Sequence, residues 1–76
     1  MEDSLGYKVG KRIKQIREEK KISQQDLAAR CNFEKSNLSR LEAGRTDAKL
    51  STLEKVAKGL NVQIKDLLDF QKGTSS

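Results

Sequence analysis

The apolar residues of this chain recur at the spacing of an α-helix, in stripes only two or three turns long. Val9, Ile13 and Ile16 recur at i, i+4 and i+7, which predicts a helix over about residues 7–20. No segment alternates apolar and polar residues as a half-buried strand does, and proline is absent. Short apolar stripes are buried only by packing against one another. The pattern therefore predicts an all-α domain of short helices.

Between the stripes lie residues that begin and end helices. Ser23 is placed to cap a second helix, with Asp26 at its third helical position, as in a capping box. Asn32 tolerates the left-handed backbone with which helices often stop, so we expect this helix to end there. A third helix is expected over about residues 35–43, with Gly44 as its stop.

Two further helices follow a polar loop. Residues 51–54, Ser-Thr-Leu-Glu, form a capping box at the start of a fourth helix, and Asn61 is its expected end. Ile64, Leu67 and Leu68 define a short fifth helix. The predicted core is Val9, Ile13, Ile16, Leu27, Ala28, Cys31, Phe33, Leu38, Leu41, Leu53, Val56, Ala57, Leu60, Val62, Ile64 and Leu67.

A chain of 76 residues forms one domain, which we expect over residues 7–70, with flexible polar ends at 1–6 and 71–76. Such a core yields only about 3–5 kcal/mol of net stability, so association with a partner would help. Sixteen Lys and Arg against eleven Asp and Glu give a net charge of +5, which favours a polyanionic partner, most often nucleic acid.

The composition argues against several classes of protein. Without histidine, the chain has no His-based metal site, His general base or Ser-His-Asp triad. It also has no phosphate loop and no clustered carboxylates, so we expect no enzyme and no cofactor, and no small-molecule ligand is evident. The one cysteine, Cys31, forms no internal disulfide and suits a reducing cytoplasm. We expect it to pack as a small hydrophobe rather than to react. The apolar runs are too short to span a membrane, and the first residues do not form a signal peptide.

Residues 23–44 carry the informative pattern: two short helices joined by a tight turn, with the small Ala28 on the inner face of the first. The run Ser-Gln-Gln-Asp-Leu-Ala over residues 23–28, then Phe33, then Leu-Ser-Arg-Leu-Glu-Ala-Gly over residues 38–44, resembles the phage-repressor and Cro-like XRE family. The resemblance continues through residues 53–62 and covers about residues 8–70. It implies five helices in a lambda-repressor-like helix-turn-helix domain.

The resemblance implies roles for the residues of the third helix and its surroundings. Leu38 and Leu41 point inward, so the opposite face of this helix is expected in the DNA major groove, reading base edges. Lys35 on this face has a simple phosphate contact as its alternative role. The predicted base-reading residues are Lys35, Ser36, Ser39 and Arg40.

Other positions are expected to contact the DNA backbone, which positions a protein without reading sequence. Gln24 lies at the start of the second helix, where free N–H groups bind phosphate. Asn37 flanks the reading face, and Arg45 and Lys49 lie in the loop after it. For Gln24 and Lys49, a solvated side chain is the alternative. Glu34 departs from the family, which often has serine there, and it faces phosphates poorly.

The resemblance also implies a structural pair of Arg17 and Glu42, able to form a bidentate ion pair that ties the third helix to the first. Leu68 and Phe70 are the predicted dimer-interface residues, with packing inside the monomer as their alternative. We therefore expect a sequence-specific transcriptional regulator that binds a pseudo-palindromic operator in double-stranded DNA as a homodimer. An antitoxin-like or other protein-interaction module on the same fold is the alternative.

Overall fold

The computed structural model describes residues 4–70, and five helices are present in that range. Residues 1–3 and 71–76, which include most of the predicted flexible ends, lie outside the described residues. The prediction of an all-α fold with five short helices is confirmed. The helices are α1 (Leu5–Glu19), α2 (Gln24–Cys31), α3 (Lys35–Glu42), α4 (Leu50–Leu60) and α5 (Ile64–Leu67).

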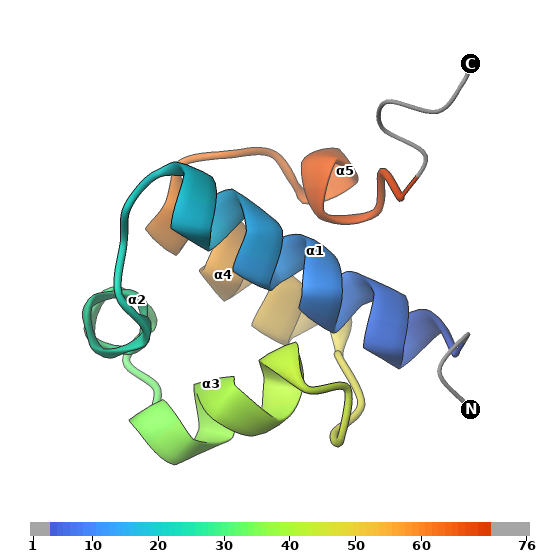
Figure 1. The fold of residues 1–76 in the computed structure, drawn as a ribbon, viewed down its shortest axis with the longest axis horizontal. Helices are drawn as coiled ribbons and strands as arrows, with labels where there is room; N and C mark the ends of the chain where they lie inside the picture. The colour runs from blue at the N-terminus through green and yellow to red at the C-terminus, as the bar shows by residue number, and fades with distance from the viewer. Residues whose placement is uncertain (1–3, 71–76) are drawn as a thin grey trace.

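The long α1 crosses α4, with α3 on one side of it and α5 on the other (Figure 1). The helix α2 packs against both α3 and α4. Apolar residues from all five helices meet at the centre, where Ile13, Leu27, Leu38, Val56 and Leu67 are completely buried. The short helices thus bury their stripes against one another, as the sequence pattern requires.

The core differs from the prediction in four residues. Ile22 is buried although it lies in the connection between α1 and α2, outside any helical stripe. Phe33, Val62 and Ile64 are only partly buried and pack at the edge of the core. All three lie in or beside short connections, where one side of the residue faces solvent.

The predicted helix stops are present. Asn32 and Asn61 have left-handed backbone, with φ of 59° and 61°, and Gly44 has φ of 74°. Lys21 also has a positive φ, of 61°, although lysine has no special tolerance for this region. The left-handed residue turns the chain after α1, and Ile22 N–H donates to the carbonyl oxygen of Arg17 at 3.0 Å.

Two predicted helix starts were wrong. α1 begins at Leu5, inside the predicted flexible segment, because the Ser4 hydroxyl accepts a hydrogen bond from the backbone N–H three residues later at 3.2 Å. α4 begins at Leu50, with Lys49 at the N-cap and no side-chain cap. The Lys49 carbonyl already accepts the first helical hydrogen bond, so Ser51 lies within the first turn rather than at the cap.

Two glycines allow the helices to approach closely. A Cβ on Gly10 would lie 2.3 Å from the Leu41 carbonyl oxygen, so α1 and α3 are in backbone contact there. A Cβ on Gly59 would lie 2.9 Å from the Cys31 Sγ, where α4 meets α2. Among the described residues, no helix combines the length and the apolar character needed to cross a bilayer.

Candidate nucleic-acid interface

The helices α2 and α3 form a helix-turn-helix unit. The Ser23 hydroxyl caps α2 by accepting a hydrogen bond from Asp26 N–H at 3.0 Å. Asn32 ends α2, and the chain re-enters a helix at Lys35. Ala28 of α2 is buried, and α2 packs against both α3 and α4. The turn leaves one long face of α3 open to solvent.

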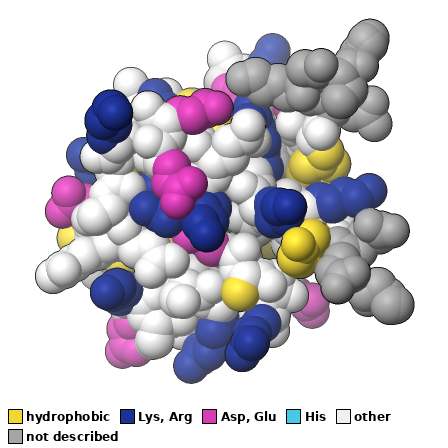
Figure 2. Space-filling view, viewed as in Figure 1, with side chains coloured by type: hydrophobic (Ala, Val, Ile, Leu, Met, Phe, Trp, Pro, Cys, Tyr) yellow, Lys and Arg dark blue, Asp and Glu magenta, His cyan; other side chains and the backbone are white. Residues whose placement is uncertain are grey.

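The exposed face of α3 is polar and basic. Leu38 and Leu41 are buried and anchor the helix to the core. The four residues predicted to read bases are all exposed, and α3 brings them together on one surface. Figure 2 shows Lys and Arg side chains at several places on the visible face of the molecule, including the lower edge, where α3 lies. The residues are Lys35, Ser36, Ser39 and Arg40.

Asn37 and Arg40 interact on this surface. The Arg40 Nη1 donates to the Asn37 Oδ1 at 3.0 Å, which orients the guanidinium along α3. Both residues line a surface hollow of about 190 Å³ between α3 and the loop that follows it. Thr46, Asp47 and Thr52 line the same hollow. These three residues were not among the predicted site residues, because isolated threonine and aspartate residues in a polar segment carry no distinctive signal.

The remaining predicted phosphate contacts lie at the edges of α3. Arg45 and Lys49 are exposed in the loop between α3 and α4. Gln24 is only half exposed, and its Nε2 donates to Glu42 Oε1 at 2.9 Å. Its amide nitrogen therefore turns inward and has one N–H left, so a phosphate at this place would meet that N–H together with the backbone at the start of α2.

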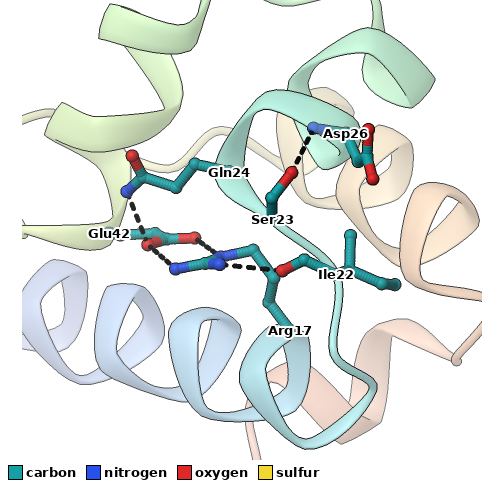
Figure 3. Close-up of polar contacts among 6 residues, drawn as sticks. All are labelled: Arg17, Ile22, Ser23, Gln24, Asp26 and Glu42. Atoms are coloured by element: carbon teal, nitrogen blue, oxygen red, sulfur yellow. Dashed lines mark hydrogen bonds and ion pairs between the residues drawn. The ribbon is translucent and has the colours of Figure 1, made fainter.

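A buried ion pair fixes the orientation of α3 relative to α1 (Figure 3). The Arg17 Nε donates to Glu42 Oε2 at 2.7 Å, and its Nη2 donates to Glu42 Oε1 at 3.1 Å, which is the bidentate geometry. The Arg17 side chain also donates to the Ile22 carbonyl oxygen at 2.8 Å. Because the amide of Gln24 also donates to Glu42, this one carboxylate of α3 is linked to α1 and to the start of α2.

The predicted dimer residues fall in different environments. Leu68 is 42 % exposed, directly after α5. Phe70 packs partly against the core, and the Lys8 Nζ lies 6.0 Å from its ring centroid. The alternative to a dimer interface was packing inside the monomer. This alternative fits Phe70, which packs against the core, better than it fits the exposed Leu68.

Cys31 contributes to packing rather than to the exposed surface. It is buried, and its Sγ donates to the Lys55 carbonyl oxygen at 3.4 Å. Burial raises the pKa of the thiol, although Lys55 and Arg30 nearby partly oppose this shift. A raised pKa keeps the thiol protonated and unreactive at neutral pH.

Comparison with known proteins agrees with this geometry. The helix-turn-helix family profile matches residues 13–67. The control protein C.BamHI of Bacillus amyloliquefaciens is 38% identical over 92% of this chain and 88% of its own length. The immunity repressor of Bacillus phage phi105 is 46% identical over 74% of this chain, which spans only 39% of that repressor.

A solved structure extends the likeness to the whole arrangement of helices. The restriction-modification controller protein C.AhdI from Aeromonas hydrophila superposes with a TM-score of 0.77 at 28% identity, covering 79% of this chain and 91% of the controller. The exposed α3, the short turn before it and these relatives agree on one assignment. The chain belongs to the phage-repressor and Cro-like XRE family of helix-turn-helix DNA-binding proteins.

Proposed function

We propose that this protein is a sequence-specific transcriptional regulator that inserts α3 into the major groove of its operator. The supporting observation is the division of α3 into two faces. Leu38 and Leu41 hold the helix in the core, and the opposite face presents hydrogen-bonding side chains to solvent. Arg40 and Lys35 have the donors to bind guanine O6 and N7, and serine hydroxyls serve either kind of base.

Backbone contacts would set the register of α3 in the groove. The N-terminus of α2 offers free N–H groups beside Gln24, and Arg45 and Lys49 add positive charge in the loop that follows α3. Gln24 donates to Glu42, the last residue of α3, so the ion pair of Arg17 and Glu42 would hold the start of α2 and the end of α3 together. We propose this rigidity as the reason that a buried charge pair is retained in so small a core.

We further propose that the protein works as a homodimer through an apolar surface beside α5. Leu5, Leu50 and Leu68 are 64 %, 75 % and 42 % exposed, respectively. Together with Leu53 and Ala48 they line one surface hollow of about 370 Å³, contributed by α1, α4 and the segments next to them. A second copy of the chain is the occupant we propose, because a core of this size gains stability from association.

A symmetric dimer of this kind presents two α3 helices to one face of the DNA. The operator is then a pseudo-palindrome with half-sites about one helical turn apart, roughly 10–10.5 bp. Selection of bound fragments from a random double-stranded DNA library tests this directly. We expect an enriched, two-fold symmetric site. Recovery of no enriched sequence contradicts the proposal.

Substitution of Leu68 by glutamate tests the dimer surface. A buried carboxylate without a partner opposes association, so we expect Leu68→Glu to weaken the dimer by at least tenfold in sedimentation equilibrium. The control is Ala29→Glu, which places the same charge at an exposed position of α2 outside the hollow. An unchanged dimer in Leu68→Glu means that the interface lies elsewhere.

A protein-interaction role on the same fold is the second candidate. Glu34 favours it, because this exposed carboxylate at the N-cap of α3 forms no cap hydrogen bond and would face approaching phosphates. The salt dependence of DNA binding separates the two functions. A DNA-binding regulator loses affinity linearly in log salt, with a slope of about −0.9 per phosphate contacted. Weak binding that does not change with salt indicates a protein partner.

The near end-to-end correspondence with C.BamHI, itself a control protein, leads us to propose a regulator of the same kind. Such a protein would act in the cytoplasm by binding rather than catalysis, without a cofactor. Among the described residues, no cluster of potential metal ligands lies beside α3. The random-library selection tests this role too, since a regulator of this kind should enrich one two-fold symmetric site.

A further inference from the structure

Arg12 is a second buried arginine on α1, and it has no acidic partner among residues 4–70. It is only 9 % exposed, as deeply placed as the ion-paired Arg17. Its Nε donates to the backbone oxygen of Asp66 at 2.9 Å, and its Nη1 donates to the Gln15 Oε1 at 3.0 Å. In that part of the chain, the one ion pair within 4.0 Å is that of Arg17 and Glu42.

The charge of Arg12 is therefore only partly compensated. A guanidinium has five N–H donors, and these two hydrogen bonds engage one donor each. The Asp66 carbonyl belongs to α5, whose C-terminal end carries a partial negative charge. A partial charge and a neutral amide do not replace the hydration that a buried cation loses. Arg12 thus retains donors and charge that suit an anionic partner.

The surroundings of Arg12 form a surface hollow of about 140 Å³. Lys8, Arg12 and Gln15 lie one turn apart on the same face of α1 and form one wall. Asp69 and Phe70 form the other wall, and the Lys8 Nζ lies 6.0 Å from the Phe70 ring centroid. The two cations exceed the single carboxylate, so the lining has a net positive charge.

We propose that this hollow is a binding site for a small oxyanion, such as inorganic phosphate or a small carboxylate. Arg12 offers free donors of the kind that bind oxyanions in bidentate geometry, and Lys8 adds a second charge at the rim. The hollow of about 140 Å³ has room for a small anion. This site is separate from the exposed face of α3 and does not depend on DNA binding.

Titration of inorganic phosphate into the full chain at constant ionic strength, followed by NMR of the backbone amides, tests the site. We expect saturable shifts confined to Lys8, Arg12, Gln15, Asp69 and Phe70. A parallel titration with acetate identifies the kind of oxyanion, because the anion that fits the site is the one whose amide shifts saturate. Dispersed shifts that grow linearly with both salts would overturn the proposal, because they report a general salt effect.

Three variants make the test specific. Lys8→Gln removes an exposed charge at the rim and should weaken phosphate binding about tenfold, as expected for the loss of one charged hydrogen bond. Lys14→Gln is the matched control, because Lys14 is exposed on the same helix outside the hollow. The affinity of this variant for phosphate should equal that of the unchanged protein. Asp69→Asn removes a repulsive carboxylate and should strengthen binding. Equal affinities in Lys8→Gln and Lys14→Gln, or weaker binding in Asp69→Asn, would overturn the proposal.

Discussion

Two buried arginines on α1 have contrasting surroundings. Arg17 faces α3, where the Glu42 carboxylate neutralises it and the Ile22 carbonyl accepts a further hydrogen bond. Arg12 faces α5, where it donates to a backbone carbonyl and to the neutral amide of Gln15. The same residue type on one helix therefore forms a closed, neutral junction at α3 and an open, positively charged one at α5.

The two junctions restrain their helices to different degrees. A bidentate ion pair has a narrow range of geometries, so this junction restrains the orientation of α3 relative to α1. A single hydrogen bond to a carbonyl restrains α5 less, and it leaves room in the hollow beside it. Substitutions at and near the two junctions test this difference.

The largest effect is expected for Glu42→Gln, which leaves Arg17 buried and without a counter-charge. Breaking a buried pair in this way costs about 3–5 kcal/mol, close to the whole stability of so small a core. Urea unfolding followed by circular dichroism measures it. The double variant Arg17→Met with Glu42→Leu should recover most of the loss, because it removes both charges. A stable Glu42→Gln protein with unchanged DNA affinity would show that the pair does not hold α3.

Gly10→Ala tests the close contact beside the same pair. Helix propensity alone predicts a gain of about 1 kcal/mol. The new Cβ would lie 2.3 Å from the Leu41 carbonyl oxygen and 2.7 Å from that of Glu42, so the α3 backbone must move. We expect a net loss of about 1–3 kcal/mol. Gly6→Ala is the control on the same helix, since its nearest new contact is 3.9 Å away, and thermal unfolding should show it stabilised or unchanged.

Arg12→Met should cost less than either change. The variant loses two hydrogen bonds, but it also removes a buried charge that lacks an acidic partner, so we expect a loss of about 1 kcal/mol. Urea unfolding beside Glu42→Gln gives the comparison directly. If the two variants lose equal stability, then Arg12 is as well compensated as Arg17 and the contrast between the two junctions fails.

Lys21→Gly should have the smallest effect and the opposite sign. The left-handed backbone at position 21 costs a non-glycine residue about 1 kcal/mol, and glycine removes this cost. Glycine also gives the unfolded chain more conformational freedom, which offsets part of the gain. We expect a gain of about 0.5 kcal/mol or slightly more, measured as a rise in Tm. Asn61→Gly is the control, because asparagine already tolerates this conformation and should gain less. A loss in Lys21→Gly would mean that its side chain contributes to the turn.

Much of the fold was predictable because its signals are local. Capping by Ser23 and the stops at Asn32, Asn61 and Gly44 depend on a few neighbouring residues, and these predictions are confirmed. The start of α4 was not predictable from the Ser-Thr-Leu-Glu pattern of residues 51–54, because the first helical hydrogen bond already closes on the Lys49 carbonyl.

The candidate interface divides in the same way. The inward positions of Leu38 and Leu41 follow from helical spacing, and they leave the predicted base-reading residues on the exposed face. The inward turn of the Gln24 amide was not predictable, since it depends on the position of Glu42, eighteen residues away. The roles of these residues on DNA stay predictions until an operator is known.

The sequence by itself determined the helices, their apolar faces and the family, because helical periodicity and caps act over three or four residues. The family resemblance already implied the pair of Arg17 and Glu42, but the tertiary structure alone decided that Arg12 is buried without an acidic partner among residues 4–70, and where helices touch. Composition and helical periodicity do not separate Arg12 from Arg17, or Gly6 from Gly10. They differ only in what α3 and α5 place against them, because electrostatic and steric energies depend on distance in space rather than on separation along the chain.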